Sequence, residues 1–67
     1  MNTVTIQADL RHFAGTLYTR TFGIVPIVQW CGDNTWRVSK NGITLGYVDL
    51  GTRTFTYIGT DKTVRLA

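Results

Sequence analysis

The chain has 67 residues, and we expect residues 1–67 to form a single small domain. Its one cysteine, Cys31, excludes an intramolecular disulfide, and no Cys/His cluster offers a structural zinc site, so no cofactor is expected. Seven Lys and Arg side chains oppose four Asp and no Glu, and the net charge of +3 favours an acidic protein surface or nucleic acid as partner. No signal-peptide pattern opens the chain and no apolar run approaches a membrane span, which predicts a cytoplasmic protein without a membrane partner.

The N-terminal part of the chain predicts strands around one short helix. Twelve threonines, together with many valines and isoleucines, favour a pleated sheet over long helices. Alternation of polar and apolar residues over residues 3–8 predicts a first strand. Asp9 then caps a short helix over residues 10–14. Residues 16–22 and 24–30 predict the next two strands.

Gly23 and Pro26 limit the predicted strands in this region. Gly23 ends the strand over residues 16–22. Pro26 has no N–H to donate to a sheet, so its strand lies at an edge, carries a bulge there, or begins at that residue. Residues 31–34 form the next turn.

The central hairpin is the clearest local signal. Asn41-Gly42 suits a two-residue type I′ turn, because both positions need positive φ. With that turn, Lys40 pairs with Ile43, Val38 with Leu45, and Trp36 with Tyr47. One face then carries an expected core: Trp36, Val38, Ile43, Leu45 and Tyr47.

Three more segments complete the predicted fold. Gly51-Thr52 suits a type II′ turn leading into a strand over residues 53–58. A turn over residues 59–61 precedes a closing strand over residues 63–66. The fold class is therefore all-β or β-rich α+β: a small antiparallel meander or half-open barrel of five to six strands, with one short helix after the first strand.

The candidate binding surface is the face of the sheet opposite the expected core, formed by the central hairpin and the strand over residues 53–58. If Gly51-Thr52 closes the hairpin, Val48 pairs with Phe55 and Gly46 with Tyr57. The expected binding residues on or beside this face are Arg37, Arg53, Phe55 and Tyr57, with Arg20 and Lys40 as flanking cations. Arginines among aromatic rings suit a protein-binding hot spot and also single-stranded nucleic acid. The alternative is that the sheet curls and these rings form a second core patch.

Catalysis has little support in the sequence. The four aspartates are far apart along the chain and lie in predicted turns or at strand ends. His12 and Cys31 form a base and a nucleophile only if the fold brings them together with a third residue. We therefore expect a non-enzymatic protein.

The expected function is docking on another macromolecule, in first place a protein, which it modulates or inhibits. Short basic chains without catalytic motifs are common as accessory factors of phages and other mobile elements, and we adopt that background expectation. The alternative is a nucleic-acid-binding module that uses the Arg/aromatic sheet face. A homodimer through an exposed sheet edge also remains open.

Overall fold

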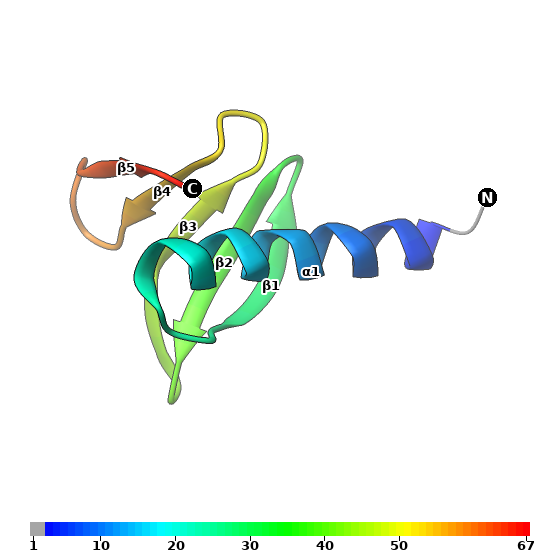
Figure 1. The fold of residues 1–67 in the computed structure, drawn as a ribbon, viewed down its shortest axis with the longest axis horizontal. Helices are drawn as coiled ribbons and strands as arrows, with labels where there is room; N and C mark the ends of the chain where they lie inside the picture. The colour runs from blue at the N-terminus through cyan, green and yellow to red at the C-terminus, as the bar shows by residue number, and fades with distance from the viewer. Residues whose placement is uncertain (1–2) are drawn as a thin grey trace.

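The computed structural model describes the backbone of residues 3–67 and the side chains of residues 7–67. One helix precedes an antiparallel sheet of five strands in the order β1-β2-β3-β4-β5 (Figure 1). The elements are α1 (Thr3–Phe22), β1 (Ile27–Gly32), β2 (Thr35–Lys40), β3 (Ile43–Asp49), β4 (Thr54–Tyr57) and β5 (Thr63–Arg65). The sheet is an open meander with β1 and β5 at its edges, which confirms the predicted fold class.

The helix is longer than predicted, and it lies before all the strands. Residues 3–8 and 16–22 were expected as strands, yet both belong to α1. These two predictions are wrong because the threonine-rich composition outweighed a helical spacing of apolar residues. Ala14, Leu17 and Tyr18 recur at intervals of three and four and are all buried. The side chains of residues 3–6 lie outside the described residues.

Threonine has a low helix propensity, but two threonine hydroxyls in α1 form hydrogen bonds with backbone carbonyls four residues earlier in the helix. The hydroxyl of Thr19 donates to the carbonyl of Gly15 at 2.8 Å, and that of Thr21 donates to Leu17 at 2.9 Å. The helix therefore owes its stability chiefly to packing on the sheet. No helix in the described part of the chain combines the length and apolarity that a membrane span needs.

Gly23 ends α1. The sequence predicted an end at this residue, but the end of a strand and not of a helix. Its φ of 74° lies in the left-handed region, and its N–H donates to the Thr19 carbonyl at 2.8 Å. The chain then turns back through residues 24–26 and begins β1 directly after Pro26. Of the three outcomes expected for Pro26, the strand begins beside it and also lies at an edge.

The central hairpin has the predicted turn but a shifted register. Asn41 and Gly42 have φ values of 53° and 78°, and Lys40 pairs with Ile43. A bulge then inserts Leu45 opposite Val38.

The bulge moves every later residue of β3 by one position. Trp36 consequently pairs with Val48 instead of Tyr47. The expected core face is therefore wrong beyond the bulge, since Tyr47 faces away from α1 and Val48 faces it. Ile43 was also expected in the core, but it is 65% exposed at the hairpin tip.

The core lies between α1 and one face of the sheet. Its buried members are Ala14, Leu17, Tyr18, Val28, Trp36, Val38, Val48, Phe55 and Leu66. The alternative of a second core patch is correct in burying Val48 and Phe55, but both belong to the same core as Trp36, because the bulge places them on the face that α1 covers. The expected pairs of Val48 with Phe55 and of Gly46 with Tyr57 are also confirmed.

The loop between β3 and β4 differs from the expected two-residue turn. Four residues, 50–53, connect Asp49 to Thr54, and the left-handed residue is Arg53 at φ 56°. The Asp49 carboxylate accepts hydrogen bonds from the N–H groups of Gly51 and Thr52. A side-chain cap therefore stabilises this loop, and the type II′ prediction at Gly51 is wrong.

Candidate functional site

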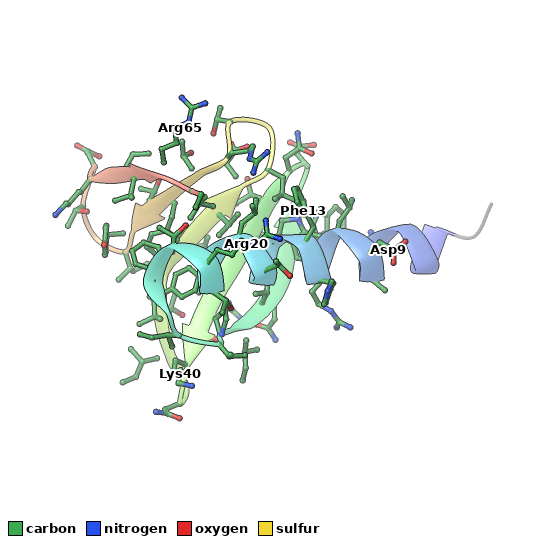
Figure 2. All side chains as sticks on the ribbon, viewed as in Figure 1. Asp9, Phe13, Arg20, Lys40 and Arg65 are labelled. Carbon is green, nitrogen blue, oxygen red and sulfur yellow. The ribbon has the colours of Figure 1, made fainter. Side chains whose placement is uncertain are left out.

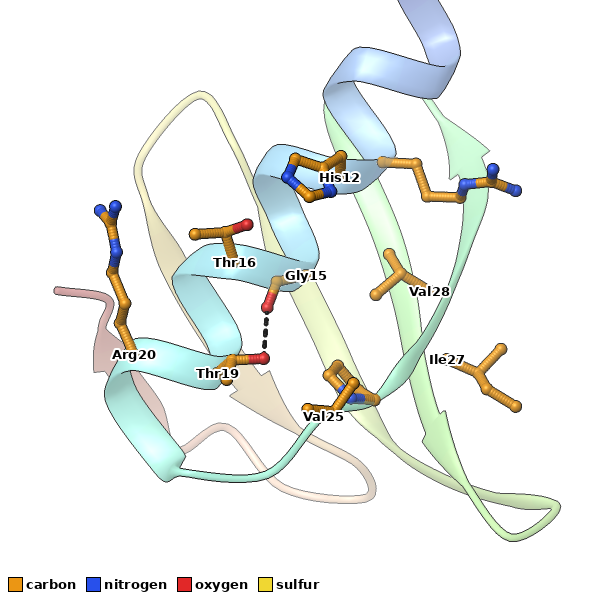
Figure 3. Close-up of a pocket in the computed structure, with 10 residues that line it drawn as sticks. His12, Gly15, Thr16, Thr19, Arg20, Val25, Ile27 and Val28 are labelled. Carbon is orange, nitrogen blue, oxygen red and sulfur yellow. Dashed lines mark hydrogen bonds between the residues drawn. The ribbon is translucent and has the colours of Figure 1, made fainter.

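A groove lies between α1 and the start of β1. It encloses about 490 Å³, and Figure 3 shows residues from α1 along one side and residues 25–28 along the other. Its lining residues are Arg11, His12, Gly15, Thr16, Thr19, Arg20, Val25, Pro26, Ile27 and Val28.

One wall of this groove is apolar and exposed to solvent. Val25 is 71% exposed, and Pro26 and Val28 continue the apolar wall. The Thr19 hydroxyl, whose shorter hydrogen bond is to the Gly15 carbonyl at 2.8 Å, also lies 3.2 Å from the carbonyl oxygen of Ile24, next to this wall. The Nζ of Lys40 donates to the carbonyl of Val25 at 3.2 Å and fixes the same segment from the β2 side. The apolar wall is therefore anchored to two neighbouring elements.

The opposite wall is basic. Arg11 and Arg20 are exposed, and His12 lies between them along α1. No carboxylate is among the residues that line the groove within the described side chains. Thr16 and Thr19 line the groove from α1 as well. An anionic group with apolar neighbours matches this combination in charge and polarity.

A second hollow of about 330 Å³ continues along β1. It is lined by Gln7, Ala8, Arg11, Val28, Gln29, Trp30 and Trp36. Arg11 and Val28 line both hollows, so the two lie end to end between α1 and β1. Trp30 is 51% exposed here, and its indole N–H donates to the Asp33 carbonyl at 3.0 Å. We call the two hollows together the α1–β1 groove.

One of the sequence-predicted binding residues lines this groove, and a second contacts a residue of its wall. Arg20 lines it, and Lys40 contacts the carbonyl of Val25 at its end (Figure 2). They come from α1 and β2, and Lys40 is not itself among the lining residues.

The aromatic residues of the predicted surface lie elsewhere. Phe55 is 1% exposed, so its placement on an open face is wrong. Tyr57 is half-buried, and its ring packs edge-on against Phe55 at 5.1 Å and Phe22 at 6.2 Å between centroids. The bulge in β3 and the cover supplied by α1 explain both placements. Neither ring offers a free flat surface to a nucleic-acid base.

The other predicted arginines are separated from the groove and from each other. The guanidinium of Arg53 lies 5.8 Å from the centre of the Phe13 ring and within 3.4 Å of the carbonyl of Ala67. Arg37 lies on the sheet face away from α1 and donates to the side chain of Gln29. The six predicted residues therefore do not form one surface.

The sheet face away from α1 is here called the outer face, and its central row of side chains is polar. One register row crosses all five strands through Gln29, Arg37, Tyr47, Thr56 and Thr63. Tyr47 was expected in the core but lies half-buried on this face because of the bulge.

Three groove residues were not predicted as binding residues. In the sequence they fell in the short helix predicted over residues 10–14 or in the strand predicted over residues 16–22. Arg11, His12 and Thr16 gain their common orientation only from a continuous α1. The available signal was the four-residue spacing of His12, Thr16 and Arg20, which places them along one side of a helix.

Within the described side chains, no group of three or more His, Cys, Asp or Glu residues is placed to hold a metal ion. His12 lines the groove, whereas Cys31 is exposed and is not among the groove residues. The structure does not bring these two side chains into one site. A comparison of the chain with protein-family models, curated proteins and solved structures finds no match.

Proposed function

We propose that this protein is a non-catalytic binding protein that docks on an acidic segment of another protein through the α1–β1 groove and thereby modulates that partner. The observation that carries this proposal is the pairing of an apolar wall with a basic wall in one groove. Docking can then combine burial of apolar side chains with charge complementarity. The single exposed thiol of Cys31 suits a reducing compartment, and we place the protein in the cytoplasm.

The burial of the predicted stacking rings favours a protein partner over nucleic acid. Single-stranded nucleic acid binds through flat exposed rings and cations, with about 1–3 kcal/mol from each stacked base. Phe55 lies in the core and Tyr57 packs against it. The cations alone favour any polyanion, so the test includes oligonucleotides as a competing ligand.

The test is a fluorescence anisotropy titration with a labelled eight-residue peptide that alternates glutamate and valine. Labelled single-stranded and duplex DNA are titrated in parallel, at about 50 and 200 mM salt. We expect the peptide to bind and to retain more of its affinity at the higher salt than either DNA. DNA binding alone, with a steep loss between the two salt concentrations, would contradict the proposal and favour the nucleic-acid alternative.

A matched pair of variants locates the binding site. Arg11→Gln with Arg20→Gln removes two charges from the groove, whereas Lys62→Gln with Arg65→Gln removes two charges near β5. We expect the groove variant to weaken peptide binding roughly tenfold, since each exposed ion pair contributes up to about 1 kcal/mol. The β5 variant should bind nearly as well as the parent. Equal losses would mean that only net charge matters.

A further inference from the structure

The backbone of β1 offers an unpaired edge beside the α1–β1 groove. β1 is the first strand in the sheet order and has a hydrogen-bonded neighbour on one side only, β2. The segment over residues 23–32 contains no charged residue. Natural edge strands are usually protected from pairing by lysines or other charges. This edge lacks that protection apart from Pro26, which precedes the strand.

The other edge of the sheet is protected. β5 has only three residues, Thr63–Arg65, and Lys62 and Arg65 lie at its two ends. Lys62 also reaches over the ring of Tyr57, at 5.4 Å from its centre. A short strand with cations at both ends is a poor template for a further strand. The two edges of this sheet therefore differ in their capacity to pair.

The shape of the groove follows β1. Its two hollows meet at Val28, with residues 25–28 on one side of the meeting point and residues 28–30 on the other. A strand rises about 3.3 Å per residue, so the six residues of β1 span roughly 20 Å. An occupant that fills both hollows must be long and narrow. An extended peptide satisfies this condition.

We propose that the partner's acidic segment binds as an extended strand that pairs with the free edge of β1 and makes a sixth strand of the sheet. This inference rests on the proposed function and specifies how the groove is occupied. Alternate side chains of the added strand point toward α1, where Arg11 and Arg20 meet its carboxylates. The remaining side chains lie on the outer face beside Ile27, which is 58% exposed.

Charge favours an acidic partner over a second copy of this chain. Pairing of two β1 edges would bring two basic groove walls, each with Arg11, His12 and Arg20, toward the same interface. Like charges held close together oppose association. An acidic strand places opposite charges at the same positions. A homodimer through β1 is therefore the competing outcome of the test.

N-methylation of the glutamate–valine peptide tests strand pairing directly. In one isomer the methyl groups replace the amide hydrogens along one edge of the extended peptide, and in the other isomer those along the opposite edge. Both isomers keep every side chain and every charge. If the peptide pairs with β1, one isomer should lose affinity by at least roughly tenfold, equivalent to about 1.4 kcal/mol, while the other binds like the unmodified peptide.

Amide hydrogen exchange of the full chain, measured by NMR, provides an independent readout. Bound peptide should slow exchange at alternate amides of β1, while the amides of β5 stay unchanged. Equal binding of both methylated isomers, without new protection in β1, would overturn strand addition but leave groove binding intact. Absence of binding by the unmodified peptide would overturn both proposals. A peptide-free dimer with β1 amides already protected would overturn strand addition in favour of a second copy.

Discussion

The ring of Phe55 lies directly over the backbone of Gly46 on the neighbouring strand. A Cβ atom at Gly46 would come within 2.5 Å of the ring Cζ and 2.9 Å of Cε1, and it would also meet the carbonyl of Thr56. Phe55 in turn packs edge-on against Tyr18 and Phe22, at 5.2 and 5.3 Å between ring centres. The missing side chain of Gly46 therefore makes room for the aromatic part of the core.

Replacement of this glycine should be among the most damaging small substitutions in the chain. We expect Gly46→Ala to lower the free energy of unfolding by about 3 kcal/mol, because Phe55 and the β4 backbone must both move. Urea unfolding followed by circular dichroism measures the change. A loss below about 0.5 kcal/mol would mean that the sheet accommodates the added methyl group.

A second glycine provides the matched control. Gly15 lies inside α1, where a Cβ atom would make an ordinary contact of 3.6 Å with Val28. Gly15→Ala should raise the free energy of unfolding by about 0.5–1 kcal/mol, because alanine restricts the unfolded chain and favours the helix. The same urea experiment should thus give opposite signs for the two alanines. A destabilised Gly15→Ala would argue against a continuous helix over this region.

Alkaline pH should destabilise the fold through Tyr18. Burial raises the pKa of the Tyr18 phenol above its ordinary value of 10.0, and the neighbouring Tyr57 adds to that rise. Above about pH 10 the unfolded chain loses this proton while the folded chain still holds it, so stability falls as the pH rises toward the folded pKa. Tyr18→Phe should flatten that decline between pH 9 and 11, as measured by urea unfolding across the range. An unchanged slope would exclude this residue as the cause.

The C-terminus should contribute to stability although it follows the last strand. Leu66 is 4% exposed, and its N–H donates to the carbonyl of Arg53 at 2.8 Å. The N–H of Ala67 then donates to the Thr21 hydroxyl on α1 at 2.9 Å. Leu66→Ala should cost about 2–3 kcal/mol in thermal or urea unfolding. Val25→Ala, at a 71% exposed position, should cost less than about 0.5 kcal/mol.

Local turn chemistry explains why the sheet could be predicted from the sequence. Asn41-Gly42, the break at Gly23 and the turn at Gly59 all occur where positive φ is needed. These residues set the order of the strands along the chain, and antiparallel neighbours follow from short connections. The strands of the meander were therefore accessible from the residues alone, to within a few positions at their ends.

The helix and the register depended on contacts between distant residues. α1 contains Thr16, Thr19 and Thr21, whose local preference is for strands, and its packing on β1 and the core overrides that preference. The local signal for the bulge at Leu45 is the glycine that follows it inside the strand, Gly46, and the bulge exchanges the faces of Tyr47 and Val48.

The length of α1 and the bulge in β3 also decided how much of the site could be predicted. Arg20, which was predicted as a binding cation, lines the groove, and Lys40 donates to the carbonyl of Val25 beside it. Arg11 and His12 were missed because a helix ending at Ala14 does not align them with Arg20. Phe55 was misplaced because a surface strand was expected where α1 covers the sheet.

Chemical-shift mapping by NMR would test the central claim, that the α1–β1 groove is the binding surface. The glutamate–valine peptide is titrated into uniformly ¹⁵N-labelled protein, and the backbone amide shifts are followed. Binding in the groove predicts shifts concentrated at Gly15, Thr19, Ile27 and Val28, with little change along Tyr47 and Thr56. Shifts concentrated on the outer face around those last two residues, with the groove amides unchanged, would contradict the account.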